Sequence, residues 1–318
     1  MLIGHRGAPA RYPEESLEGT LAAAALGAWG VECDAVPTRD GALVCRHAAD
    51  DLAETTNILA TRWAKSCVEP FRPAGLFARA RARCRTLELF RADFLALEAW
   101  PEGRNPRARR PEDYYRAARY PASLAQSPAH PLNHAGFVRV LAPLGVAYFA
   151  ELKPTPELPP GLRREALLRA LVDAYRRQGV PPERVYLQSR ALEDLAFWRA
   201  YASAYAARAL WIDGRRLDPE DPGSGSPGME ALRASGLRHL APPIRYLLAG
   251  EGGRLRPTAY ARAACRAGLV LFPWTLERSR LGPPEALLSA LGGLCVRAVF
   301  SDDPGGYSPR ERKKPASR

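Results

Sequence analysis

The chain has 318 residues, of which 47% are apolar, so it can bury a substantial core as one large domain or two small ones. Its formal net charge of +12 raises the question of nucleic-acid binding. Nearly all of this charge is arginine spread along the chain, which is typical of a coding bias rather than of a binding surface, so we rank nucleic-acid binding last. No apolar run reaches the roughly 18 residues that a membrane-spanning helix needs.

No secretory signal is visible, because the first expected strand begins at Met1 itself. Taken as it stands, the chain is expected to be cytoplasmic, and it is expected to be secreted or periplasmic if a leader precedes it. Nothing in the sequence specifies an oligomeric state.

Apolar runs with strand character alternate with stretches of helical periodicity along most of the chain. After the first strand, the expected strands cover residues 30–36, 42–47, 146–151, 184–188, 209–213, 239–241, 269–273 and 298–301, and the expected helices cover residues 15–26, 163–178, 192–205, 228–235, 257–266 and 283–291. Repeated strand–helix units in one long domain predict an α/β fold, a closed (β/α)8 TIM barrel. An open doubly wound sheet is the alternative, but no Gly-rich phosphate fingerprint follows the first strand.

Residues 48–145 break this rhythm, because they are rich in Arg, Pro and Ala and show no clean strand–helix repeat. We interpret them as an insertion or small subdomain on top of the barrel, within one domain that spans residues 1–309. Residues 310–318 form a basic tail that is expected to be disordered. Residues 214–228 are expected to form a flexible loop.

The six cysteines include no C-x-x-C pair, so a zinc site is not expected. Cys33 and Cys45 fall in expected core strands, where we predict that they are buried apolar residues. Cys67 and Cys84 lie in the irregular segment and are able to form a bridge in an oxidising compartment.

Glu32 and Asp34 are the most informative pair in the sequence. Alternate residues of a strand share a face, so both carboxylates point the same way. Two adjacent carboxylates repel, and a hard divalent cation such as Mg²⁺ or Ca²⁺ is the usual way to offset their charge. A later apolar strand also ends in charged residues, Glu151 and Lys153.

His5, Arg6 and His47 also follow expected strands. The carboxyl ends of parallel barrel strands meet at one face of the barrel, where barrel enzymes carry their chemistry. Two histidines beside an Arg and a Lys predict acid–base chemistry on an anion. Gln188 and Trp274 fall at the ends of two further strands and are candidates to line the substrate site.

A series of motifs, in order along the chain, resembles the glycerophosphodiester phosphodiesterase family. They are GHRGA (4–8), PEESLE (13–18), GVECD (30–34), DG (40–41), CRH (45–47), TTNI (55–58), ELK (151–153), WTLERS (274–279) and FSD (300–302). The resemblance covers nearly the whole chain, and the ordered set is far more specific than any one motif. It implies a (β/α)8 barrel, in agreement with the fold predicted from periodicity.

The resemblance also implies a role for most of the candidate side chains. Glu32, Asp34 and Glu151 would hold one divalent cation, Mg²⁺ or Ca²⁺. His5 and His47 would be the acid–base pair, and Arg6 and Lys153 would bind the phosphate.

Several positions depart from the family pattern. Ala48 stands where the family usually has Asp, so Asp50 or Asp51 would have to take over if that residue orients the second histidine. Ser16 and Arg190 stand where Thr and Phe are common. Elsewhere we expect structural roles, with His130, His134 and His239 on the surface or in the core and Asp302 as a helix cap.

The leading hypothesis is a hydrolase that uses a divalent cation to convert glycerophosphodiesters to glycerol 3-phosphate and an alcohol such as choline or ethanolamine. The second is a phosphodiesterase acting on lysophospholipids, which an apolar groove rimmed by residues 48–145 would favour. The third is a weak or inactive relative that binds phosphoesters. In each case the expected partner is a small phosphodiester and not a nucleic acid.

Overall fold

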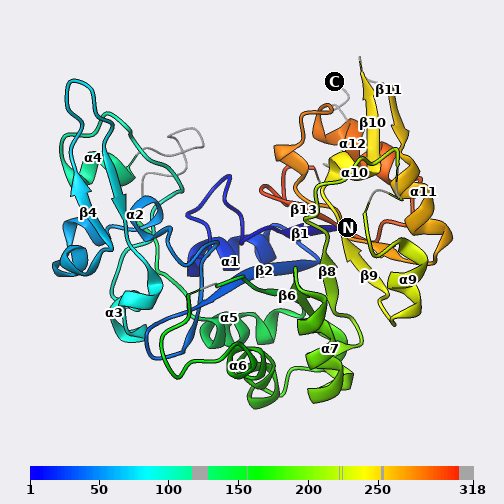
Figure 1. The fold of residues 1–318 in the computed structure, drawn as a ribbon, viewed down its shortest axis with the longest axis horizontal. Helices are drawn as coiled ribbons and strands as arrows, with labels where there is room; N and C mark the ends of the chain where they lie inside the picture. Colours follow the sequence, from blue (N-terminus) through cyan, green and yellow to red (C-terminus); the bar gives the residue numbers. More distant parts are fainter. Residues whose placement is uncertain (117–127, 156, 222, 224, 252–253, 308–318) are drawn as a thin grey trace, which may run out of the picture.

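Eight parallel strands form the centre of the protein in a computed structural model that describes residues 1–116, 128–155, 157–221, 223, 225–251 and 254–307. The tail expected at residues 310–318 lies outside these residues. The strands are β1 (Leu2–Gly4), β2 (Gly30–Pro37), β6 (Ala147–Leu152), β7 (Val185–Ser189), β8 (Leu210–Ile212), β9 (His239–Ala241), β12 (Val270–Leu271) and β13 (Val299–Ser301). Their spatial order is β12-β9-β8-β7-β6-β2-β1-β13. Most of them are labelled in Figure 1.

Backbone hydrogen bonds join the chain around β12 to the chain around β13, the two outer strands of this sheet. Leu271 N donates to Cys295 O (2.9 Å), Arg297 N donates to Leu271 O (2.9 Å), and Phe300 N donates to Pro273 O (3.0 Å). The sheet therefore curls into a barrel, as the periodicity predicts.

Side chains alternate between the inside and the outside of the barrel along each strand. On β2, Val31 and Cys33 join the apolar layer between the strands and the helices, whereas Glu32 and Asp34 point to the opposite face. Gly30 is required on that inner face, because a Cβ there would lie 2.6 Å from the ring of Phe149. The strand period thus sends both carboxylates into the barrel.

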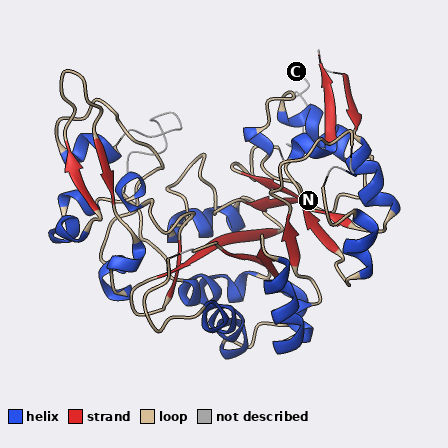
Figure 2. Ribbon diagram, viewed as in Figure 1, coloured by secondary structure: helices blue, strands red, loops and turns tan. Residues whose placement is uncertain are grey.

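Helices cover the outer face of the sheet (Figure 2). They are α1 (Leu17–Ala25), α5 (His134–Leu141), α6 (Arg164–Arg177), α7 (Leu192–Tyr201), α8 (Ser203–Ala206), α9 (Met229–Ala234), α11 (Ala259–Arg266) and α12 (Pro284–Leu291). The Oγ of Ser16 accepts from Gly19 N (3.0 Å) and caps α1, so Ser serves where Thr is common. None of the described helices is long and apolar enough to cross a membrane.

A hairpin that the sequence analysis did not predict follows β9. The short helix α10 (Ile244–Leu247) leads into β10 (Leu248–Glu251), which pairs antiparallel with β11 (Arg254–Pro257).

The strand expected at 42–47 is not a barrel strand, which corrects the prediction. β3 (Leu43–Cys45) runs antiparallel to β2. Thr38 N donates to Ala42 O (2.9 Å) and Gly41 has a φ of 73°, so the chain turns back on itself in a hairpin. Hydrophobic periodicity does not encode strand direction, but the length of the connection does, because the link from Pro37 to Leu43 is too short for the crossover that two parallel strands need.

Much of the segment between β3 and α5 forms a separate layer at the left of Figure 1. It contains α2 (Leu52–Thr55), β4 (Glu69–Arg72), β5 (Arg81–Arg83), α3 (Arg91–Leu95) and α4 (Pro111–Tyr115). These elements share an apolar cluster of their own, which Val36 and Val44 connect to the β2–β3 hairpin. Helix α5, although it lies within the 48–145 range, packs in the barrel layer against α1 and α6.

Three disulfides, Cys33–Cys45, Cys67–Cys84 and Cys265–Cys295, pair all six cysteines. The Cys67–Cys84 bridge is the one that the sequence allowed. The prediction that Cys33 and Cys45 are simply buried apolar residues was wrong, because the hairpin brings their Cα atoms to 5.3 Å, within disulfide range.

We expect the Cys265–Cys295 bridge to stabilise the barrel, because it closes a loop of 30 residues in the unfolded chain. Replacing both cysteines with Ser should lower the free energy of unfolding by about 3 to 4 kcal/mol, measured by urea denaturation without reductant. Replacing Cys67 and Cys84 is the matched control, since that bridge lies in the separate layer and should leave the main transition of the barrel in place. An unchanged urea midpoint for the first variant would contradict the prediction.

Candidate active site

The carboxyl ends of the strands surround a pocket of about 520 Å³. All nine candidate residues line it, namely His5, Arg6, Glu32, Asp34, His47, Glu151, Lys153, Gln188 and Trp274. No described residue of the 48–145 segment lines the pocket, so the described part of that segment does not form the apolar groove that would favour lysophospholipids.

Glu32, Asp34 and Glu151 bring three buried carboxylates together, with one oxygen from each lying within 4.8 Å of the others. Asp34 pairs with Glu151 in the register of β2 and β6. Burial, together with Asp34 and Glu151, raises the pKa of Glu32 well above its usual value. Burial would also raise the pKa of Asp34, but Lys153 and Arg6 lower it. A bound proton or a cation must therefore offset part of the charge of this cluster.

The three carboxylates fit a hard divalent cation. Glu32 Oε2, Asp34 Oδ1 and Glu151 Oε1 are buried and make no hydrogen bond. Buried carboxylate oxygens that accept no hydrogen bond are the ligand type that Mg²⁺ and Ca²⁺ prefer. A second group of potential ligands around Glu15 does not fit a metal, because both of its cysteines are bonded to each other.

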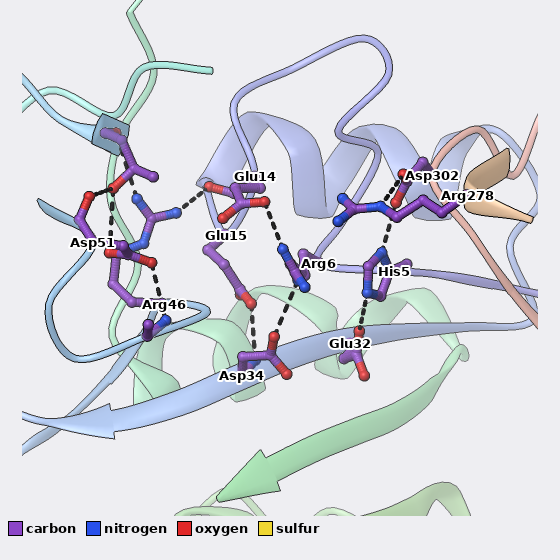
Figure 3. Close-up of polar contacts among 12 residues, drawn as sticks. His5, Arg6, Glu14, Glu15, Glu32, Asp34, Arg46, Asp51, Arg278 and Asp302 are labelled. Carbon is purple, nitrogen blue, oxygen red and sulfur yellow. Dashed lines mark hydrogen bonds and ion pairs between the residues drawn. The ribbon is translucent and has the colours of Figure 1, made fainter. Parts of the chain in front are cut away.

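Two cations, Arg6 and Lys153, flank the carboxylates. Arg6 Nε lies 3.1 Å from Asp34 Oδ2, and its Nη1 donates to Glu14 Oε2 at 3.0 Å (Figure 3). Lys153 Nζ lies 2.9 Å from Glu151 Oε2 and 3.4 Å from Asp34 Oδ2. Burial would lower the pKa of each cation, but the neighbouring carboxylates raise it, so both side chains stay charged.

The backbone around Arg6 is strained. Arg6 has a φ of 56° and Glu15 has a φ of 58°, values that residues other than Gly rarely adopt. Glu15 N donates to Arg6 O (3.0 Å), and Glu15 Oε1 accepts from Asp34 N (2.9 Å). These bonds connect the loop after β1 to β2. Neither Glu14 nor Glu15 was predicted to have a role, although two consecutive glutamates follow the first strand in the sequence.

His5 is fixed by Asp302, which lies at the end of β13. His5 Nδ1 lies 2.6 Å from Asp302 Oδ1, and Arg278 Nε donates to Asp302 Oδ2 at 2.8 Å (Figure 3). The carboxylate holds the proton on Nδ1, so Nε2 faces the pocket, 3.8 Å from Glu32 Oε2. The expected helix-cap role of Asp302 is therefore wrong. The contact between Asp302 and His5 could not be predicted from local sequence, because it depends on barrel closure, which places β13 beside β1.

His47 reaches the pocket differently, at the end of the β2–β3 hairpin. Its ring makes no hydrogen bond with any described residue, and burial with Arg6 and Lys153 lowers its pKa to about 3. Asp51 Oδ2 accepts from Ala48 N (3.0 Å), which fixes the backbone beside His47 rather than its ring.

Asp50, the other carboxylate considered for orienting His47, pairs with Arg83 at 3.1 Å. Neither Asp50 nor Asp51 therefore replaces the Asp that the family usually has at position 48.

Gln188 and Trp274 complete the pocket. Gln188 Nε2 donates to Glu32 Oε1 (3.1 Å), so it orients one of the carboxylates. Trp274 Nε1 donates to Ala241 O (2.9 Å), which fixes the indole in the wall.

The other three histidines lie outside the pocket, in agreement with the structural roles expected for them. His134 is buried, with Nε2 3.1 Å from Tyr175 Oη, His130 Nδ1 contacts Glu18, and His239 packs against Phe272.

Comparison with known proteins points to one family. The model of the glycerophosphoryl diester phosphodiesterase family matches residues 5–306. A protein of Arthroderma benhamiae named "Extracellular protein" is 34% identical over 189 residues, which are 56% of this chain and 75% of that protein.

Solved structures show a similar fold. One, from Silicibacter pomeroyi and assigned to the glycerophosphoryl diester phosphodiesterases, has a TM-score of 0.66 at 20% identity, covering 96% of this chain and 90% of that one. Another, an Oleispira antarctica phosphodiesterase in complex with the product sn-glycerol-3-phosphate, has a TM-score of 0.60 at 17% identity, covering 96% and 94%. At these identities the structural likeness supports the fold alone.

We expect Mg²⁺ or Ca²⁺ to stabilise the folded protein, because a cation bound by three native carboxylates binds the folded state alone. At one hundred times the Kd, linkage contributes about 2.7 kcal/mol. The Tm should then rise by roughly 5 °C in a thermal melt. Glu32→Gln should abolish the shift, whereas Glu193→Gln, on the exposed face of α7, should keep it. If the cation raised the Tm of both variants equally, it would bind at a site other than the three carboxylates.

Proposed function

The chain belongs to the glycerophosphoryl diester phosphodiesterase family and is a phosphodiesterase of that class, and on this basis we propose that it hydrolyses glycerophosphodiesters to glycerol 3-phosphate and an alcohol. The observation that carries this proposal is the convergence of three buried carboxylate oxygens, two cations and two histidines in one pocket. A binding protein has no need of an acid–base pair beside a cation site.

Glu32, Asp34 and Glu151 would hold one divalent cation, Mg²⁺ or Ca²⁺. When bound, the cation polarises a non-bridging phosphate oxygen and stabilises charge that develops on the phosphoryl group. Gln188 orients Glu32 for this task. The buried Oε1 of Gln188 has no hydrogen-bond partner and would accept a hydrogen bond from a hydroxyl of the substrate.

Arg6 and Lys153 would bind the phosphodiester. Arg6 offers a planar fork of donors, and Lys153 offers a compact charge. Their ion pairs with Asp34 and Glu151 hold both cations at the edge of the carboxylate cluster before substrate arrives. A phosphodiester monoanion placed there meets donors that are already oriented, which lowers the cost of positioning it.

His5 and His47 would act as the acid–base pair. One accepts the proton of the nucleophile, and the other gives a proton to the leaving alcohol oxygen, each transfer contributing on the order of 10² to 10⁴ in rate. Asp302 positions His5 and stabilises the imidazolium that forms when Nε2 takes up a proton. Trp274 would form the wall against the glycerol moiety.

Hydrolysis is expected to depend on the cation. Release of glycerol 3-phosphate from glycerophosphoinositol or glycerophosphocholine should require Mg²⁺ or Ca²⁺ and stop on addition of EDTA. Glu32→Ala should lower kcat/KM by on the order of 10³-fold, since a lost cation removes several kcal/mol of transition-state stabilisation, and Glu193→Gln is the control.

Two outcomes would redirect this proposal. Release from a lysophospholipid, but not from either glycerophosphodiester, would support the second hypothesis. Tight binding of glycerol 3-phosphate without turnover of any substrate would support a weak or inactive relative.

Asp302→Asn should impair catalysis more than binding, because Asn is a neutral partner for His5. We expect kcat to fall by on the order of 10²- to 10⁴-fold with KM nearly unchanged. Glu277→Gln is the matched control, since Glu277 accepts from Asp302 N (2.7 Å) but does not touch His5. An equal loss of kcat in the control would assign Asp302 a purely structural role.

We also propose that the protein works in an oxidising compartment. All six cysteines are paired, and disulfides persist mainly in secreted, periplasmic and surface proteins. The name of the Arthroderma benhamiae relative agrees with this location. Free thiols in denatured, unreduced protein taken from its own cells would contradict it.

A further inference from the structure

Three exposed arginines stand at the mouth of the pocket and have no part in the reaction proposed above. Arg190 follows β7, Arg245 belongs to α10 after β9, and Arg280 follows β12, and all three line the pocket. We call them the arginine rim. They follow three different strands, β7, β9 and β12, at the carboxyl end of the barrel.

The rim has little negative charge to balance it. Among the described residues that line the pocket, the acidic ones are the three carboxylates Glu32, Asp34 and Glu151. Arg245 and Arg280 form no ion pair with any described carboxylate, and Arg190 Nε lies 3.5 Å from Glu151 Oε1. A divalent cation on the carboxylates would take up their charge and leave the rim without a counterion.

The pocket is also poorly suited to a cationic alcohol. A choline-like group is usually recognised over an aromatic face or beside a carboxylate. The Trp274 ring lies in the pocket wall near the rim, and the guanidinium of Arg190 already lies over it, 5.8 Å from the ring centroid. Arg245 in the same way lies over the ring of Tyr246, 5.0 Å from its centroid. An ammonium group entering here would meet like charge.

We propose that the arginine rim binds an anionic group, a phosphate or a carboxylate, on the alcohol portion of the substrate. This inference rests on the proposed phosphodiesterase activity and names the substrate class that the activity serves. Arg6 and Lys153 bind the phosphodiester at the floor of the pocket, and the rim binds the second anion at its mouth. Guanidinium groups suit this task, because they form paired, charge-assisted hydrogen bonds with phosphate and carboxylate oxygens.

General attraction of anions is the competing explanation for the rim. Long-range attraction would speed the encounter with every anionic substrate and would weaken steeply with salt. Direct contact, in contrast, discriminates between two substrates that differ by one anionic group.

The test compares glycerophosphoinositol with glycerophosphoinositol 4-phosphate, which differ by one phosphate on the alcohol. For the wild-type protein, kcat/KM should be higher for the phosphorylated substrate by about 10- to 100-fold, and glycerophosphocholine should be the poorest of the three. In Arg245→Gln and Arg280→Gln, the ratio of kcat/KM for the two inositol substrates should fall by about tenfold. Arg245→Lys, which keeps the charge but loses the fork, should give an intermediate ratio.

Arg238→Gln is the matched control. Arg238 is exposed at the opposite, amino-terminal end of β9, and its replacement removes the same charge as the rim substitutions to Gln. Its ratio should equal that of the wild type. Equal kcat/KM for the two inositol substrates, or an equal fall of the ratio in Arg238→Gln, would overturn the role of the rim and leave the phosphodiesterase proposal intact. Absence of turnover with all three substrates would instead count against the phosphodiesterase proposal itself.

Discussion

Repulsion among three buried carboxylates is the constraint around which the rest of the site is arranged. Glu32, Asp34 and Glu151 lie on adjacent strands, out of water, with one carboxylate oxygen of each within 4.8 Å of the others. Such a cluster is costly unless positive charge surrounds it. Arg6 and Lys153 supply part of that charge, and the three oxygens without a hydrogen bond leave room for the rest.

The same constraint explains why so many elements meet at this end of the barrel. The strained loop after β1 delivers Arg6 to Asp34, and the β2–β3 hairpin returns the chain so that Arg46 N donates to Asp34 O (2.7 Å). Arg46 is itself fully buried, and its Nη2 donates to Glu14 O (2.6 Å). Each contact gains strength from the low dielectric that makes the carboxylates costly.

Strand periodicity and strand ends were sufficient to predict the barrel and the nine candidate residues, all of which are among the residues that line the pocket. Inside-outside alternation predicts that Glu32 and Asp34 share a face, and barrel topology predicts that His5 and Glu151 meet them. Asp302 was missed because its contact depends on how the last strand closes against the first, which no local pattern encodes.

Three other features were also missed. The Cys33–Cys45 bridge and the position of Arg190 over Trp274 depend on distances between segments, whereas the direction of β3 follows from its link to β2, which is too short for a parallel crossover. Such distances are set by tertiary structure, so the sequence pattern could not specify them, but the short Asp40-Gly41 turn did indicate the hairpin.

The separate apolar cluster of the insertion bears on how this protein can change over evolutionary time. Residues in that cluster share few neighbours with the barrel core, and the connection runs through Val36 and Val44 on the hairpin. Substitutions in the two cores should therefore combine additively rather than epistatically. The sequence of the insertion can then change, or acquire a new binding partner, while selection on the reaction continues to maintain the residues of the barrel.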